Sequence, residues 1–145
     1  MENVRLYLMP EGKMVSSSCG MFGDGKLEKF NEWFSEFERP LYPKDFLWYD
    51  DEQGGFIWYY MHSEGMNVPD GFSIVDFKGG LYAVATEIDG ADSSELMQAI
   101  RNFIFVKGFE EDPSRKIMGT VTTAPQASQI LGYEQMDYLV PIKTK

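Results

Sequence analysis

The sequence predicts an α+β fold built from two similar halves, each with β-strands and one helix. Two glycine-bounded runs of β-prone residues, 12–20 and 80–90, are each followed by an amphipathic helix pattern. Four apolar positions of the first helix recur 69 residues later, and the pairs are Leu27 and Leu96, Phe30 and Ala99, Phe34 and Phe103, and Phe37 and Val106. Identity is confined to the Leu and Phe pairs, so the repeat is one of pattern more than of sequence.

The length and composition fit one domain of two repeats. At 145 residues and 43% hydrophobic content, the chain is large enough to bury a sizeable core. We expect one domain over 1–145, with repeat one at about 1–65 and repeat two at about 71–145. Seams between packed repeats are common ligand sites, so a groove between the repeats is expected.

Each half shows strand and turn signals in an ordered series. The first half is expected to contain strands at 4–10 and 13–19, a helix from an Asp24 N-cap to about Glu38, and a hairpin of 46–50 and 56–62. The second half is expected to contain strands at 71–77 and 81–88, a helix from the capping sequence 92–95 to near Gly108, a short strand at 117–121, a helical turn at 125–131 and a last strand at 136–143. This series favours two βαββ repeats forming an antiparallel sheet with the helices on one face.

The charge balance narrows the classes of partner. Thirteen basic against twenty-three acidic residues give a net charge of −10, which disfavours nucleic-acid backbones and anionic membranes and favours cationic or basic partners. An acidic surface that keeps a bacterial-type protein soluble explains the same charge. The lone Cys19, the lack of an apolar run of membrane length and the lack of a signal pattern indicate a cytoplasmic setting.

Signals for catalysis, metals and cofactors are weak. His62 is the single histidine, so no multi-histidine metal site is available. The glycine-rich stretches lack phosphate-binding spacing, and the acidic run 110–112 is typical of a solvated loop. No metal, cofactor or catalytic residue is therefore predicted.

Aromatic residues and one carboxylate form the candidate ligand site. Trp48, Trp58, Tyr60 and Tyr133 lie on or near expected strands, where aromatic faces could hold a cation, although strand aromatics also serve cross-strand packing. Asp137 lies in an apolar strand, and a buried carboxylate must be paired, hydrogen-bonded or protonated. Asp137 is therefore expected either to contact a ligand or to form an internal ion pair.

Several motifs resemble the GyrI-like small-molecule-binding domain, the effector-binding domain of many AraC-type and MerR-type transcription activators. They are the run 78–85, the closing Gly90 with its following helix, and the terminal Asp137-Tyr-Leu-Val-Pro-Ile142. The stretch 9–12 and Trp58-Tyr59-Tyr60 resemble its first repeat, so the resemblance covers essentially the whole chain. This sequence would be a stand-alone form without a DNA-binding domain.

The resemblance implies a groove in which aromatic side chains and a buried acidic residue meet lipophilic cations. The family's last strand commonly reads Glu-x-Tyr-x-Pro. Here Asp137 takes the acidic position with a shorter side chain, and Leu139 replaces the tyrosine. Alternation places Asp137, Leu139 and Pro141 on one face of that strand.

Three functions from different classes follow. The first is a binding protein for an amphipathic, cationic or aromatic small molecule, as in multidrug sensors. The second, implied by stand-alone relatives, is a hydrolase of reactive drug-like molecules, with Asp137 and either Tyr133 or Tyr7 as candidate groups. The third is an acidic protein that binds and inhibits a DNA-handling enzyme. We expect the first, with a homodimer or a protein partner as further possibilities.

Overall fold

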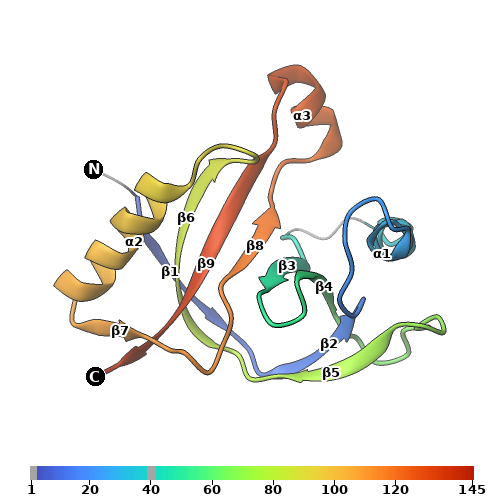
Figure 1. The fold of residues 1–145 in the computed structure, drawn as a ribbon, viewed down its shortest axis with the longest axis horizontal. Coiled ribbons are helices and arrows are strands. Elements are labelled where there is room, and N and C mark those ends of the chain that lie inside the picture. The colour runs from blue at the N-terminus through green and yellow to red at the C-terminus, as the bar shows by residue number, and fades with distance from the viewer. Residues whose placement is uncertain (1–2, 39–41) are drawn as a thin grey trace. The chain divides into compact units, whose positions relative to one another are not determined.

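A computed structural model describes residues 3–38 and 42–145 and confirms the predicted α+β class with antiparallel strand pairing (Figure 1). In chain order the elements are β1 (Arg5–Met9), β2 (Gly12–Ser16), α1 (Lys26–Ser35), β3 (Asp45–Asp50), β4 (Gly55–Met61), β5 (Ser73–Phe77), β6 (Gly80–Ile88), α2 (Ser94–Val106), β7 (Phe109–Glu111), β8 (Met118–Val121), α3 (Pro125–Leu131) and β9 (Gln135–Thr144). Within these described ranges no helix has the length and apolar character needed to cross a membrane.

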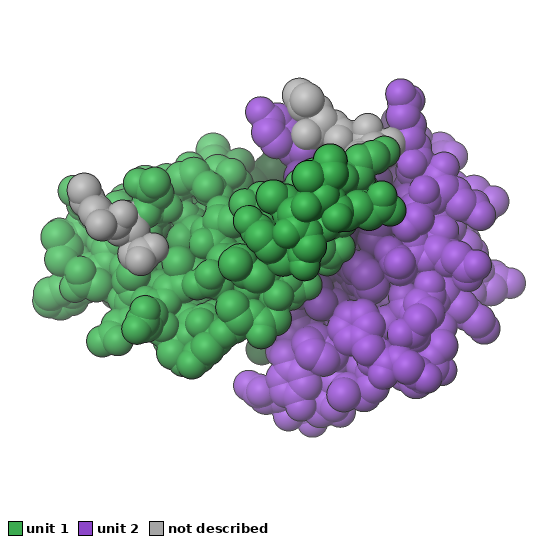
Figure 2. All heavy atoms as spheres, turned by 90° about the horizontal axis from the view of Figure 1, so that it is seen from above, with its two compact units in different colours: residues 1–10, 79–145 green, residues 11–78 purple. Residues whose placement is uncertain are grey.

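The chain divides into two compact units, coloured green and purple in Figure 2. Unit 1 comprises residues 1–10 and 79–145, and unit 2 comprises residues 11–78. The first strand belongs to unit 1 because β1 pairs with β6, from Arg5 opposite Val84 to Met9 opposite Gly80. The next strand, β2, pairs with β4 and β5 inside unit 2.

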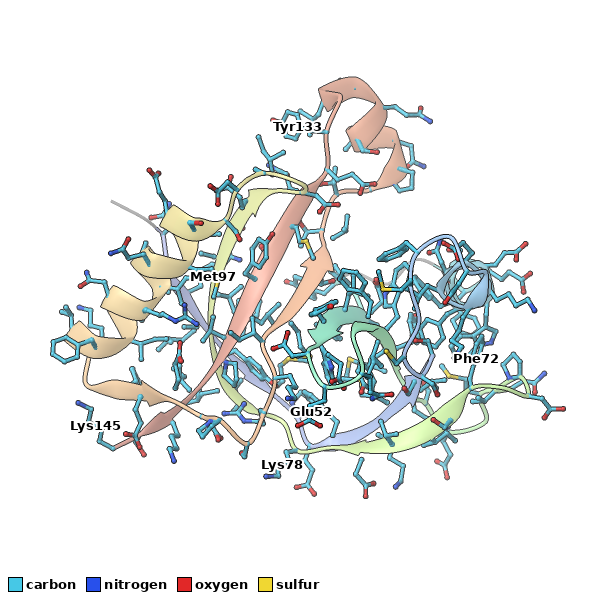
Figure 3. The ribbon with its side chains drawn as sticks, viewed as in Figure 1. Glu52, Phe72, Lys78, Met97, Tyr133 and Lys145 are labelled. Atoms are coloured by element: carbon cyan, nitrogen blue, oxygen red, sulfur yellow. The ribbon has the colours of Figure 1, made fainter. Side chains whose placement is uncertain are left out.

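In unit 1 the helix α2 covers one face of a sheet whose neighbouring strands are β1, β6, β9 and β8. The short strand β7 pairs with the end of β9. The core beneath α2 is aliphatic and consists of Ala83, Ala85, Leu96, Ile100, Ile104, Val140 and Ile142. Met97 packs at the border of this core and is labelled on α2 in Figure 3.

In unit 2 the helix α1 packs on a sheet in the order β3, β4, β2, β5. The core beneath α1 is rich in aromatic rings, and its members include Phe30, Trp33, Phe34, Phe37, Trp58, Tyr60 and Phe72. The ring centroids of Phe30 and Phe72 are 4.9 Å apart, and those of Phe34 and Tyr60 are 5.3 Å apart. Such ring contacts add to the stabilisation from burial alone.

The buried stripe of α2 differs from the predicted one. Leu96, Ile100 and Ile104 are buried, at spacings of four residues, whereas Val106 is 65% exposed. The recurrence of an apolar residue at Phe37 and Val106 therefore does not extend to burial, because Val106 lies outside the buried stripe. Apolar residues occur on several sides of α2, so their spacing in the sequence does not determine which side of the helix faces the sheet.

The start of α1 uses carboxylates, but not at the predicted N-cap. Gly25 occupies the N-cap position, and the carboxylate of Asp24 accepts hydrogen bonds from the backbone N–H groups of Met21 and Lys26 at 2.8 Å each. Glu28 accepts from the N–H groups of Gly23 and Gly25, both at 2.9 Å. These backbone donors lower the pKa values of Asp24 and Glu28.

In the region 109–131 the structure confirms two predicted elements and corrects a third prediction. The predicted short strand and helical turn are confirmed as β8 and α3. The loop prediction for 110–112 was wrong, because Glu110 and Glu111 belong to β7. Pairing with β9 and the ion pair between Arg101 and Glu111, 2.9 Å long, hold this strand, and its three residues are too few to show a period of two.

Candidate functional site

The six residues expected at the ligand site are shared equally between the two units. Unit 1 contains Asp137, Leu139 and Tyr133, and unit 2 contains Trp48, Trp58 and Tyr60.

Asp137 lies in a polar row across the sheet of unit 1, on the face opposite α2. In this row Thr86 of β6 and Thr120 of β8 stand directly opposite Asp137 on either side. The Asp137 carboxylate accepts a hydrogen bond from the Thr86 hydroxyl at 2.6 Å and forms an ion pair with Arg5 of β1 at 3.0 Å. The Asp137 side chain is 8% exposed, so the carboxylate is buried and internally paired. We call Arg5, Thr86, Asp137 and Thr120 the polar row.

The other two candidates in unit 1 differ in burial. Leu139 is buried on the same face as Asp137, between Val84 and Met118 of the neighbouring strands. Tyr133 is 39% exposed and lies where α3 gives way to β9 (Figure 3). Leu139 thus adjoins the polar row along β9, and Tyr133 precedes that strand.

Two hydroxyl groups on this face lack hydrogen-bond partners among the described residues. They are those of Thr120, next to Asp137, and Tyr82, whose side chain is fully buried. Burial raises the pKa of the Tyr82 hydroxyl, and the nearby Arg115 guanidinium, 4.7 Å from the ring centroid, opposes that rise. Sequence reasoning missed both hydroxyls, although alternation along 80–88 does place Tyr82, Val84 and Thr86 on one face.

In unit 2, Trp58 and Tyr60 lie on the face that α1 covers. The Trp58 ring lies 5.2 Å from Phe34, and the Tyr60 ring lies 6.0 Å from Trp33. The Trp58 indole N–H donates to the Asp45 carboxylate at 3.1 Å. Both candidates therefore form part of the helix–sheet core.

Trp48 lies on the opposite face of the same sheet. Its ring centroid is 4.2 Å from that of Tyr59, and we call Trp48 and Tyr59 the aromatic pair. The Trp48 indole N–H is buried without a hydrogen-bond partner among the described residues. Burial raises the pKa of Tyr59 to about 12, Ser16 opposes that rise, and the negative charge of Asp50 adds to it.

The two faces present aromatic surface, hydrogen-bonding groups and a buried carboxylate. The aromatic pair offers ring faces and an indole donor, and the polar row offers a carboxylate and a free hydroxyl. Within residues 3–38 and 42–145, no cluster of three or more His, Cys, Asp or Glu side chains could hold a metal ion. Cys19 is half-buried and forms no disulfide bond among the described residues.

Neither a family model nor a curated protein matches the sequence. The fold, by contrast, occurs among solved structures. A hydrolase from Listeria innocua superposes with a TM-score of 0.69 at 9% identity, covering 98% of this chain and 92% of that one. The EcmrR C-terminal domain gives a TM-score of 0.65 at 10% identity, with 100% and 99% covered. SAV2435 bound to tetraphenylphosphonium gives 0.53 at 11% identity, with 97% and 94% covered.

These identities are low, so the comparisons bear on the fold and leave the activity to be argued from the chain itself. The likeness to the EcmrR C-terminal domain and SAV2435 is consistent with the GyrI-like effector-binding fold that the sequence resembles. The chain thus shares the fold of these proteins over nearly its whole length.

Proposed function

We propose that this chain is a GyrI-like small-molecule-binding domain whose ligand is amphipathic and either cationic or aromatic. One observation carries the proposal. The buried side-chain polar atoms without a partner among the described residues are Trp48 Nε1, Tyr82 Oη and Thr120 Oγ1, and all three lie on sheet faces opposite a helix. Each such group costs about 1–3 kcal/mol, which a ligand with hydrogen-bonding atoms can recover, whereas a lipophilic cation without such atoms binds through the ring faces of the aromatic pair.

The aromatic pair suits a cation with an apolar body. Trp48 and Tyr59 present ring surface, whose quadrupole attracts positive charge. Asp50 is on the same strand face as Trp48, and its charge already acts on Tyr59. The structure of SAV2435 with tetraphenylphosphonium supports this chemistry, because that ligand is a lipophilic cation.

Of the six residues expected at the site, we retain Trp48 in unit 2 and Asp137 in unit 1 as separate candidate contacts, each on its own sheet face. Asp137 supplies a buried carboxylate, and Leu139 beside it supplies apolar surface. Trp58 and Tyr60 support the sheet through their packing beneath α1. Tyr133 is a partly exposed side chain just before β9, and we assign it no ligand contact.

The decisive experiment is a calorimetric titration with tetraphenylphosphonium and tetraphenylborate, which have the same shape and opposite charge. We expect the phosphonium to bind and the borate not to bind. Trp48→Leu should weaken phosphonium binding by about tenfold or more, or about 1.4 kcal/mol. Equal binding of the two ions, or binding that ignores Trp48→Leu, would count against the proposal.

A matched pair of variants tests the role of charge on this face. Asp50→Asn and Asp45→Asn each remove one negative charge from β3, but register places Asp45 opposite Tyr60 on the face that α1 covers. An Asn at position 50 keeps a side-chain oxygen for the backbone N–H groups of Glu52 and Gln53 that Asp50 now binds. Phosphonium binding should weaken in Asp50→Asn and stay within about twofold of wild type in Asp45→Asn.

A hydrolase is the second candidate, favoured by the Asp137 carboxylate and the partnerless Tyr82 hydroxyl on one sheet face. The structural likeness to a hydrolase from Listeria innocua adds to it. In this alternative Asp137 would orient a water molecule and a tyrosine would protonate the leaving oxygen. Turnover of an activated ester that is lost in both Asp137→Asn and Tyr82→Phe would support it, and turnover unchanged by both would exclude these residues.

A further inference from the structure

Asp137 already holds a cation in this structure, the guanidinium group of Arg5. The Arg5 Nη2 atom is 3.0 Å from Asp137 Oδ2, and Arg5 Nη1 donates to the Thr86 hydroxyl at 3.3 Å. Arg5 reaches this position from β1, across β6, which lies between β1 and β9. The buried carboxylate is thus neutralised by a side chain from two strands away.

We propose that Arg5 is a displaceable internal counter-ion, and that the Asp137 position accepts a planar ligand cation with N–H donors in its place. Amidinium and guanidinium groups are the class that fits. This inference rests on the proposed ligand-binding role and names the cation that the polar row selects.

A second arginine of unit 1, Arg115, is buried and held by several internal partners. Arg115 has a side chain 8% exposed, contacts the Asp112 carboxylate at 3.1 Å, and donates to the backbone carbonyls of Leu81 at 3.1 Å and Ile142 at 2.7 Å. Arg5, by contrast, is 42% exposed, and among the described residues it forms an ion pair with Asp137 alone. Water can replace its contacts at low cost, so Arg5 can leave Asp137 if another cation takes its place.

The neighbouring hydroxyl explains why N–H donors matter. Thr120 stands directly opposite Asp137 on β8, and its hydroxyl has no partner among the described residues. A planar cation at Asp137 could donate one N–H to the carboxylate and a second to the Thr120 oxygen. A quaternary phosphonium has no N–H group and would satisfy neither acceptor.

The test is chemical rescue of Arg5→Ala by benzamidinium, with benzamide as the neutral, nearly isosteric probe. The control variant is Lys13→Ala, which also removes one positive charge, but from the exposed ion pair with Asp76 in unit 2. Binding by calorimetry and thermal unfolding by circular dichroism are measured for both variants, for wild type and for Arg5→Ala combined with Asp137→Asn.

We expect benzamidinium to bind Arg5→Ala at least about tenfold more tightly than wild type and to raise its unfolding temperature, while benzamide does neither. Lys13→Ala should behave as wild type, and the double variant should lose the gain. If Arg5→Ala does not fold alone, refolding on addition of benzamidinium but not benzamide is the expected result.

Equal benzamidinium affinity in wild type and Arg5→Ala, a gain that survives Asp137→Asn, or no refolding would overturn the inference. Thr120→Val adds a further check, because it should reduce the benzamidinium gain and leave phosphonium binding at the aromatic pair unchanged. Loss of phosphonium binding with an intact benzamidinium gain would contradict the proposed role of the aromatic pair and leave this inference standing. Phosphonium binding without a benzamidinium gain in Arg5→Ala would contradict this inference alone.

Discussion

The two units use the same arrangement, a helix on one face of an antiparallel sheet, with different chemistry in each layer. The core under α2 in unit 1 is aliphatic, whereas the core under α1 in unit 2 is aromatic. The opposite faces differ too, since unit 1 carries the polar row and unit 2 carries the aromatic pair. A shared pattern of elements thus fixes where side chains can gather, and the residue types decide which chemical groups each face presents.

The largest expected change in unfolding free energy comes from truncating one central core residue in each unit. Phe30 of α1 and Ile100 of α2 are both fully buried, on the side of each helix that faces its sheet. We expect Phe30→Ala to lower the free energy of unfolding by about 3–5 kcal/mol and Ile100→Ala by about 2–5 kcal/mol. Urea unfolding measures both changes. Phe105→Ala, at a position 74% exposed, is the control and should change it by less than about 0.5 kcal/mol.

A smaller effect is expected where unit 2 brings backbone segments close together. A Cβ atom at Gly55 would lie 2.7 Å from Cys19 Sγ and 2.8 Å from the Gly20 carbonyl oxygen. Gly55→Ala should therefore cost about 1–3 kcal/mol of unfolding free energy, because the Gly20 carbonyl cannot give way without disturbing its backbone hydrogen bonds with Phe56. Gly12→Ala, with open space around the added Cβ, should be close to neutral. Equal costs for the two would show that the close approach at Gly55 is wrong.

The smallest expected effect concerns the aromatic pair and alkaline pH. Burial raises the pKa of Tyr59 to about 12, so the folded state keeps the proton that an unfolded tyrosine loses near pH 10. The resulting stabilisation is present below pH 10 and is lost as pH rises towards 12. At pH 11 unfolding free energy should have fallen by about 1 kcal/mol on this account.

Chemical denaturation at pH 8 and pH 11 measures that loss. Tyr59→Phe should reduce the loss, while Tyr42→Phe, at a position 76% exposed, should leave it as in wild type. An identical loss in wild type and Tyr59→Phe would place the titrating group elsewhere, with Tyr60 and Tyr82 as alternatives, since burial also raises their pKa values.

The order and type of the main elements could be predicted because local signals set them. The aromatic run 56–62 and the glycine-containing turn before it matched the β3–β4 hairpin closely. The helix α3 could be predicted because Pro125 favours the first turn of a helix. At its end, Gly132 has the left-handed conformation typical of a helix terminus. Three-residue β7 carried too little periodicity to be found.

The faces of the strands could not be predicted. Alternation shows that Trp48 and Trp58 each share a face with their second neighbours, but not which face a helix covers. The structure puts Trp58 beneath α1 and Trp48 opposite it. Arg5 was missed because its meeting with Asp137 depends on the pairing of β1 with β6 and of β6 with β9, which joins residues far apart in sequence.

The most direct measurement is the indole region of a ¹H–¹⁵N correlation spectrum during titration with tetraphenylphosphonium. The chain has three tryptophans, so three indole signals are expected. Trp33 donates to the Asn67 carbonyl and Trp58 to the Asp45 carboxylate, whereas the Trp48 N–H has no partner among the described residues. The Trp48 signal should move with saturation while the other two stay nearly fixed. Movement of the Trp33 or Trp58 signal with a stationary Trp48 signal would contradict the account.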